Sequence, residues 1–234
     1  MIKHFYLLFF KIKKYFQNNL TSVKIHNSEW KKESLSAEND LLDYTKRVKE
    51  ERNKVLNNKN VQFENLLNTL SLGIDKYTII DLGSGSGDFI LTVGEKFSKI
   101  ISVEPSEEGI KIQKKLFKKY NNIEYYNQTA ENFLGNYKAK GPHLVFLFSV
   151  LMHIQVSQSE LILKKLNEFP EETILVINEI YTNKNKNVEY FMNYAPTKNF
   201  FINTLENFNL QFMGAVTPEQ NVFKGIRAYK KNIQ

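Results

Sequence analysis

The stretch Thr78-Ile-Ile-Asp-Leu-Gly-Ser-Gly-Ser-Gly-Asp-Phe89 decides the fold of this chain. Its apolar run ends at Asp81, the glycines Gly83, Gly85 and Gly87 follow, and an amphipathic segment begins directly after them. This succession predicts a buried strand, a tight turn and a helix, which together form the first βα unit of a parallel α/β sheet. Glycines at alternate positions allow positive φ and let a ligand approach where a Cβ would collide. We therefore expect a ligand site here; an ordinary glycine-rich turn is the alternative.

The glycine spacing does not match the dinucleotide fingerprint GxGxxG. Its third glycine would fall on Asp88 or on Ile90, depending on which glycine starts the count. The pattern is D-x-G-x-G-x-G, and it resembles the first motif of the class I S-adenosylmethionine-dependent methyltransferases. This resemblance implies that the three glycines line a site for S-adenosylmethionine. It also implies that Asp81 hydrogen-bonds the ammonium group of the cofactor's amino acid part.

Length and composition limit the function classes. The 234 residues suffice for one α/β domain, expected over 61–234, with an N-terminal helical extension over 1–60. The lack of cysteine excludes disulfides, Cys-based zinc sites and thiol nucleophiles, and it suits a cytoplasmic protein. The net charge of +7 admits an anionic partner. Because lysine and asparagine are abundant throughout, we favour a compositional bias over nucleic-acid binding. No convincing metal-ligand cluster is seen, and no apolar run reaches the roughly 18 residues of a membrane span.

The N-terminal extension carries two separate predictions. Over residues 1–20, Phe and Leu side chains fall on one helical face, with lysines on or near the other. Such a basic helix suits either the inner face of a membrane or packing on its own domain or a dimer partner. A second helix is expected over 37–56. Resemblance to methyltransferases whose N-terminal segment covers the cofactor pocket makes Tyr44 and Arg47 its inward-facing candidates; solvated or core-packing roles are the alternative.

A second buried strand is predicted over 99–103, and it ends in Glu104-Pro105-Ser106. Glu104 lies 17 residues beyond Gly87, about where an acid that binds ribose hydroxyls is expected. Its carboxylate can accept hydrogen bonds from both hydroxyls. The resemblance therefore implies that Glu104, with the neighbouring Pro105, belongs to the cofactor site. A helix over 110–120 follows.

A third strand is predicted over 122–128, and Thr129-Ala130-Glu131 follows it. In the family that the chain resembles, this turn touches the adenine, commonly through an Asp side chain and the next backbone N–H. Thr129 stands at the Asp position, so the resemblance places the contact mainly on the Ala130 N–H, with Thr129 and Glu131 as further candidates. Glu131 suits equally well the acid of a helix N-terminus.

A strongly apolar fourth strand is predicted over 143–149, and the sequence from Ser149 to Ile154 resembles the family's motif after that strand. Ligands bind beyond the carboxyl ends of parallel strands, so Ser149 and His153 should border the reacting methyl group. Histidine is mostly neutral at physiological pH and can take a proton, which makes His153 the first candidate for a general base. The alternative is that His153 caps or orients the following helix.

The remaining residues predict helices over 157–169 and 199–208 and strands over 172–180, 210–216 and 222–229. Ser157 and Glu160 have the spacing of a capping box that would begin the first of these helices. Glu179, near the end of its strand, is the second candidate base. The last two strands would form a closing antiparallel hairpin. The predicted fold is α/β: a doubly wound, seven-stranded, mostly parallel sheet.

The function that the resemblance implies is methyl transfer from S-adenosylmethionine. The acceptor that we expect is a small molecule, or a sugar of a surface polysaccharide or its precursor. An RNA methyltransferase and a non-catalytic S-adenosylmethionine-binding protein are the alternatives. The sequence after the fourth strand lacks Asn/Asp-Pro-Pro-aromatic, which argues against methylation of an exocyclic base nitrogen.

Overall fold

The computed structural model describes residues 65–66, 68, 73–87, 89–90, 94–181, 188–190, 193–195, 197–213, 217–219 and 222–231. The helices expected over 1–20 and 37–56 lie outside the described residues, and so do Tyr44 and Arg47.

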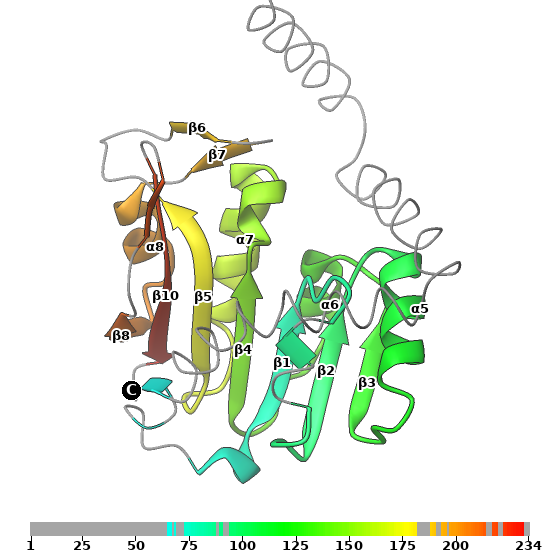
Figure 1. The fold of residues 1–234 in the computed structure, drawn as a ribbon. Helices are drawn as coiled ribbons and strands as arrows, with labels where there is room; N and C mark the ends of the chain where they lie inside the picture. Colours follow the sequence, from blue (N-terminus) through cyan, green and yellow to red (C-terminus); the bar gives the residue numbers. More distant parts are fainter. Residues whose placement is uncertain are drawn as a thin grey trace, which may run out of the picture.

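The main sheet of the described residues has seven strands in the order β3-β2-β1-β4-β5-β10-β8, and an eighth, β9, pairs with β10 beside this row (Figure 1). The five strands from β3 to β5 are parallel, whereas β10 runs antiparallel to both β5 and β8. This confirms the predicted seven-stranded, mostly parallel sheet with its closing hairpin. The strands span β1 Thr78–Leu82, β2 Lys99–Val103, β3 Ile123–Tyr126, β4 His143–Phe148, β5 Ile174–Tyr181, β8 Phe208–Met213 and β10 Val222–Lys231.

Three short strands were not predicted. β9 (Thr217–Glu219) pairs antiparallel with β10 and lies between the two strands predicted over 210–216 and 222–229. Pro218 cannot donate a ladder hydrogen bond, but the edge of a sheet tolerates proline, and β9 pairs only with β10. The other two, β6 (Val188–Tyr190) and β7 (Asn193–Ala195), form a separate two-stranded sheet.

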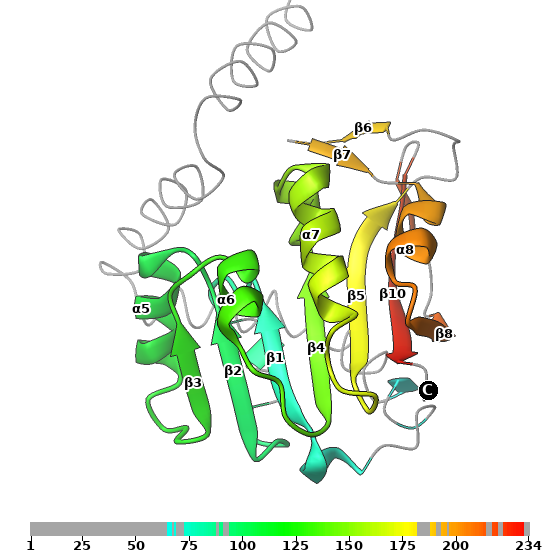
Figure 2. The ribbon, with the colours of Figure 1, turned by 180° about the vertical axis from the view of Figure 1, so that it is seen from behind.

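Helices cover both faces of the sheet, and the views from the front and from behind show this plainly (Figures 1 and 2). One face carries α6 (Ala130–Asn136), α7 (Val156–Leu166) and α8 (Lys198–Thr204), and the other carries α5 (Glu107–Leu116). Alternate strand residues supply the two cores, as a pleated sheet requires. Ile80 and Leu82 pack with α6 and α7, whereas Ile79 packs on the opposite face.

The predicted capping box at Ser157 and Glu160 is wrong. α7 begins at Val156 with Gln155 as its N-cap residue, and the Gln155 N–H donates to Gln158 Oε1 at 3.1 Å. Ser157 therefore lies inside the first turn, and Glu160 instead pairs with Lys164 at 2.7 Å. The sequence contains two pairs of residues with capping-box spacing. The pair Gln155 and Gln158, two residues before Ser157 and Glu160, makes the reciprocal contact.

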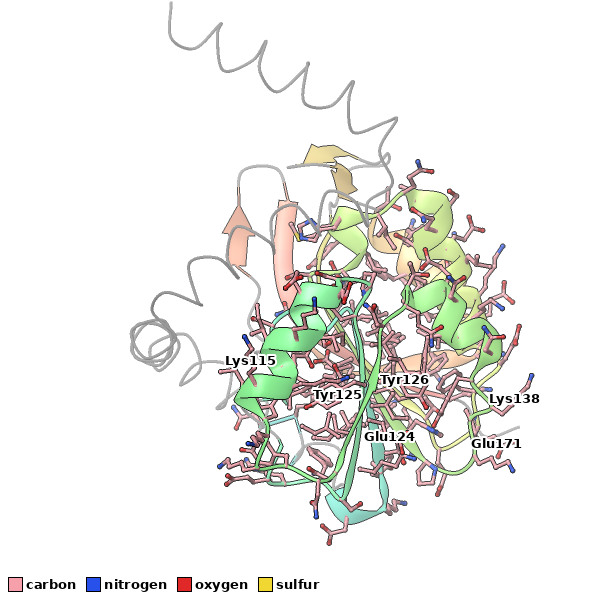
Figure 3. All side chains as sticks on the ribbon, turned by 90° about the vertical axis from the view of Figure 1, so that its right-hand side faces the viewer. Lys115, Glu124, Tyr125, Tyr126, Lys138 and Glu171 are labelled. Carbon is pink, nitrogen blue, oxygen red and sulfur yellow. The ribbon has the colours of Figure 1, made fainter. Side chains whose placement is uncertain are left out.

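β3 is the edge strand of the sheet on the side of α5 (Figure 3). Lys99 on β2 pairs with Glu124 on β3 at 2.8 Å, and Tyr125 and Tyr126 follow on the same strand. A short strand with a charged side chain suits an edge position, because such strands are poor templates for pairing with other chains.

A buried arginine joins the opposite half of the sheet to α8. Arg227 on β10 is 4% exposed, and its guanidinium carbon lies 4.4 Å from the ring centroids of both Tyr181 on β5 and Phe201 on α8. Stacking between two rings is favourable for a guanidinium. This arrangement helps to fix α8 against the sheet.

Candidate cofactor-binding site

The glycine loop after β1 has the backbone conformation that its sequence predicts. Gly83, Gly85 and Gly87 have φ values of 71°, 57° and 86°, a region that favours glycine. A Cβ on Gly83 would lie 2.6 Å from a methyl carbon of Val150, and one on Gly87 would lie 2.4 Å from the ring of Phe117. The loop is therefore packed tightly between the chain after β4 and the end of α5.

A buried polar network holds the same loop from below. Gln113 on α5 is 0% exposed, and its Nε2 donates to the Gly85 carbonyl at 2.7 Å and to Ser84 Oγ at 2.8 Å. Its Oε1 accepts a hydrogen bond from Ser102 Oγ at 2.6 Å. The two serine oxygens lie 2.7 Å apart. Every polar atom of the glutamine amide thus has a partner, which gives the loop a defined position.

Gln113, Ser84 and Ser102 were not among the site residues predicted from the sequence. One signal could have found the glutamine: Gln113 lies three residues after Ile110 and one after Ile112, on the inward face of a helix whose other inward residues are apolar. A polar side chain at such a position needs a buried partner.

Glu104 connects the end of β2 to the glycine loop. Its side chain is buried, its Oε2 accepts from the Gly85 N–H at 2.9 Å, and its Oε1 accepts from the Ser106 N–H at 2.9 Å. Burial raises the pKa of this carboxyl, and the two backbone hydrogen bonds oppose that rise. Each oxygen has a second lone pair, so the carboxylate keeps capacity to accept from hydroxyl groups of a ligand.

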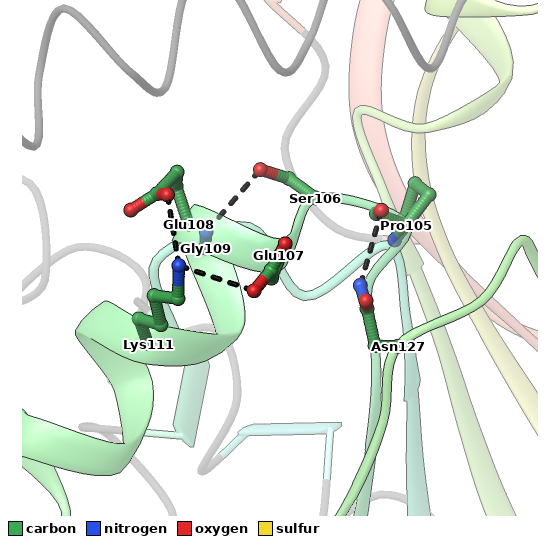
Figure 4. Close-up of polar contacts among 7 residues, drawn as sticks. All are labelled: Pro105, Ser106, Glu107, Glu108, Gly109, Lys111 and Asn127. Carbon is green, nitrogen blue, oxygen red and sulfur yellow. Dashed lines mark hydrogen bonds and ion pairs between the residues drawn. The ribbon is translucent and has the colours of Figure 1, made fainter.

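The first turn of α5 packs against this carboxylate. Ser106 caps the helix, because its Oγ accepts from the Gly109 N–H at 3.2 Å (Figure 4). A Cβ on Gly109 would lie 3.0 Å from both the Gly85 carbonyl oxygen and Glu104 Cγ. Glycine at position 109 therefore lets the helix approach the loop closely.

The end of β3 supports the same corner. Asn127 Nδ2 donates to the carbonyl of Glu104 at 3.0 Å. It also donates to the carbonyl of Pro105 at 3.1 Å (Figure 4). On the exposed side of α5, Lys111 lies 3.1 Å from the carboxylates of both Glu107 and Glu108. Pro105 thus belongs to a connection whose carbonyls are anchored by the neighbouring strand.

Thr129, Ala130 and Glu131 form the start of α6. The Thr129 Oγ1 accepts from the Asn132 N–H at 3.3 Å and caps the helix. Ala130 packs into the core, and Glu131 lies in the first turn, where an acid is favoured. One acceptor function of the Thr129 hydroxyl is therefore used by the helix itself.

The chain after β4 carries Ser149 and His153. Ser149 has a φ of 59°, and the 3₁₀ turn η2 (Leu151–His153) follows. Glu179 on β5 is 0% exposed, and its Oε1 accepts from the N–H groups of Val150 and Leu151. His153 is half-buried at the end of the turn. We call residues 149–153 the β4 loop.

These residues meet at one edge of the sheet. Since β1, β2, β4 and β5 are parallel neighbours, their carboxyl ends bring together the glycine loop, Glu104, the β4 loop and Glu179. Asp81 lies on β1 just before the loop and is 2% exposed. This is the edge at which ligands bind in open α/β sheets.

Comparison with known proteins identifies the domain. Residues 79–169 match the family model described as a methyltransferase domain. No curated protein matches the sequence. Among solved structures, the chain is similar to magnesium protoporphyrin IX methyltransferase from Synechocystis with bound S-adenosylmethionine, at 11% identity over 74% of this chain and 80% of that chain, with a TM-score of 0.54.

Two other solved structures share the fold. An S-adenosylmethionine-dependent methyltransferase from Clostridium acetobutylicum matches at 13% identity over 72% of this chain and 88% of that chain, with a TM-score of 0.55. An O-methyltransferase from a polyketide synthase multienzyme of Brevibacillus brevis, in complex with S-adenosylhomocysteine, matches at 11% identity over 67% of each chain, with a TM-score of 0.52. Residues 79–169 therefore match a methyltransferase domain, and the chain has the fold of these S-adenosylmethionine-dependent methyltransferases.

Proposed function

We propose that this methyltransferase acts on a hydroxyl oxygen of a small molecule, or of a sugar in a surface polysaccharide or its precursor. The observation that carries the proposal is the β4 loop, which has Ser149 and His153 in place of Asn/Asp-Pro-Pro-aromatic. That absent sequence is the one expected of enzymes that methylate exocyclic base nitrogens. A hydroxyl acceptor instead has a proton to lose, and a histidine beside it can take that proton.

The residues at the sheet edge fit the cofactor. S-adenosylmethionine, when bound, supplies a methyl group already activated by its sulfonium. Glu104 would accept hydrogen bonds from the ribose hydroxyls, and the positive-φ glycines leave the backbone open to close approach. Asp81 would hold the ammonium group, and the Ala130 N–H, with Thr129 and Glu131 beside it, would meet the adenine. Tyr44 and Arg47 stay predictions for the cover of the pocket.

His153 is the proposed general base. It lies on the loop that follows β4, at the edge where the acceptor must approach the methyl group. The other histidine in the described residues, His143, begins β4 at the opposite edge, and its ring contacts Tyr137 and the Gly141 carbonyl. Burial lowers the pKa of His143. Position therefore favours His153 for proton transfer.

Two solved relatives support a small-molecule acceptor. The Synechocystis enzyme is named for magnesium protoporphyrin IX, and the Brevibacillus domain is an O-methyltransferase of a polyketide synthase multienzyme. Both share the fold of this chain, and neither name includes a nucleic acid.

The acceptor class is tested by incubating the protein and labelled S-adenosylmethionine with separate small-molecule, glycan, lipid, RNA and protein fractions of a lysate. We expect label in the glycan or small-molecule fraction. The net charge of +7 makes RNA the second candidate, and label in the RNA fraction, with binding that weakens steeply as salt rises, would replace our proposal. Cofactor binding without transfer to any fraction would indicate a non-catalytic protein.

Residues 1–20 are proposed to bring this cytoplasmic enzyme to the inner face of the membrane, where lipid-linked precursors lie. No helix within the described ranges is long and apolar enough to cross a membrane. Deleting residues 1–20 should leave a cofactor-binding domain that no longer sediments with anionic vesicles. If the helix packs on its own domain, the deletion should instead lower the melting temperature by several degrees.

A further inference from the structure

Strand β5 holds three consecutive backbone N–H groups of the β4 loop. The Ser149 N–H donates to the Asn178 carbonyl at 3.0 Å. The Val150 and Leu151 N–H groups both donate to Glu179 Oε1, the second at 3.0 Å. The first of these contacts continues the sheet ladder, whereas the other two depend on a single side-chain oxygen.

The loop needs this support because of how the chain leaves β4. Ser149 has a φ of 59°, which a residue with a Cβ adopts at a cost. Val150 and Leu151 then begin the 3₁₀ turn, and the first N–H groups of such a turn have no partner within it. A buried N–H without a partner is costly, so a buried carboxylate that accepts two of them stabilises this conformation over others.

The loop in turn packs against the glycine loop. The Val150 side chain occupies the space where a Cβ of Gly83 would lie, with its methyl carbon 2.6 Å from that point. Leu151 is buried in the core beneath α6 and α7. Val150 thus connects Glu179 to the glycine loop, because its N–H donates to Glu179 and its side chain packs on Gly83.

We propose that Glu179 is a positioning residue, which holds the β4 loop against the glycine loop and does not serve as the second candidate base. The proposal rests on the proposed function only in that the β4 loop borders the acceptor. Two features separate positioning from catalysis. Glu179 is 0% exposed, so an acceptor hydroxyl has no access to it, and Oε1 already accepts two hydrogen bonds.

The test uses two variants of Glu179 and one control in the full-length protein without cofactor. Glu179→Gln keeps a side-chain oxygen that can accept the same N–H groups, and Glu179→Leu removes it. Glu172→Leu is the matched control, because Glu172 lies just before the other end of β5, is 59% exposed and pairs with the exposed Lys76 at 3.6 Å. Single-residue amide hydrogen exchange by NMR reports on Val150 and Leu151, and calorimetry with S-adenosylhomocysteine reports on the cofactor site.

We expect Glu179→Leu to lose at least about tenfold in exchange protection at Val150 and Leu151, and about three- to tenfold in affinity for S-adenosylhomocysteine, the scale of one or two lost hydrogen bonds. Glu179→Gln should keep most of the exchange protection and most of the affinity, and Glu172→Leu should change neither quantity. Unchanged protection in Glu179→Leu would overturn the proposal. So would a Gln variant that keeps full protection and affinity but loses turnover by about a hundredfold, which is the behaviour of a base. The exchange measurement needs no acceptor, so it stands even if the proposed substrate class is wrong.

Discussion

The glycine loop and the β4 loop lie side by side, and a glutamate from the neighbouring outer strand holds each of them. Glu104 at the end of β2 binds the loop of β1, and Glu179 on β5 binds the loop of β4. The two carboxylates differ in how their oxygens are used. Each oxygen of Glu104 accepts one hydrogen bond, and the two donors lie on separate segments. In Glu179, one oxygen accepts from two adjacent N–H groups. The first arrangement leaves each oxygen a second lone pair that a ligand could use, and the second suits support of the backbone.

The largest effect is expected on the chemistry of the β4 loop. His153→Gln should lower turnover by at least about a hundredfold, the lower end of what a general base contributes, because glutamine cannot take the acceptor proton. Affinity for S-adenosylhomocysteine, which depends on the glycine loop, should not change. Steady-state kinetics with the true acceptor and calorimetry measure the two quantities. A loss of turnover below about tenfold would leave positioning alone to explain the rate.

The contact between the two loops is tested at Gly83. Gly83→Ala should destabilise the protein by roughly 2–5 kcal/mol, since it adds backbone strain at positive φ to a clash with Val150. Gly141→Ala is the matched control: Gly141 has a φ of 75°, with nothing within 4 Å of its added Cβ. Gly141→Ala should lower the free energy of unfolding only through the backbone strain, by about 1–2 kcal/mol. Urea denaturation compares them, and equal losses would mean that Val150 does not press on the loop.

Glu104 should dominate cofactor affinity. Glu104→Ala should weaken S-adenosylhomocysteine binding by roughly 1.5–3 kcal/mol, the scale of hydrogen bonds to a charged group. Calorimetry across pH sharpens the test, because the raised pKa of Glu104 means that its carboxylate protonates above the usual range. Affinity should fall as pH drops through that raised pKa.

The raised pKa of Glu104 has the opposite effect on the pH dependence of folding stability. A carboxyl whose pKa is raised in the folded state binds a proton more tightly there than in the unfolded chain. Its stabilising contribution is complete below the unfolded pKa and disappears as pH rises through the folded value. Comparing denaturation of wild type and Glu104→Ala across this window should show the contribution of Glu104 growing at low pH while its role in binding declines. Parallel trends would contradict the assignment.

The smallest effect is expected at Ser149. Ser149→Gly should stabilise the fold by roughly 0.5–1 kcal/mol, because glycine removes the strain at φ 59° but costs more entropy on folding. The same change at Ser157, inside α7, should destabilise by a similar amount. Thermal denaturation resolves both, and a loss of stability at position 149 would mean that the serine side chain matters more than its strain.

The comparison also explains what the sequence could predict. The glycine loop is local, so its turn, its positive φ values and the strand before it follow from consecutive residues. Glu104 could be placed because the length of a βα unit is nearly constant. The mostly parallel sheet with its closing antiparallel hairpin followed from the alternation of strands and helices and from family resemblance.

The contacts that hold the two loops could not be predicted from the sequence. Gln113 reaches Ser84 across 29 residues, and Glu179 reaches Val150 across 29 residues as well. Such pairs depend on strand register and on the rotation of a helix, neither of which local patterns fix. Glu179 therefore appeared as a candidate base, since the end of a strand was known and the neighbouring N–H groups were not. The first residue of α7 was predicted wrongly for a related reason, because two pairs of residues with capping-box spacing lie close together in the sequence.

The packing of Val150 over Gly83 has a consequence for the order in which ligands bind. Two loops that share one contact surface are energetically linked, and linkage is reciprocal. If an acceptor that orders the β4 loop raises the affinity for the cofactor by some factor, bound cofactor must raise the affinity for the acceptor by the same factor. An acceptor that orders this loop should thus bind more tightly to the loaded enzyme than to the empty one, and product release should loosen both sites together.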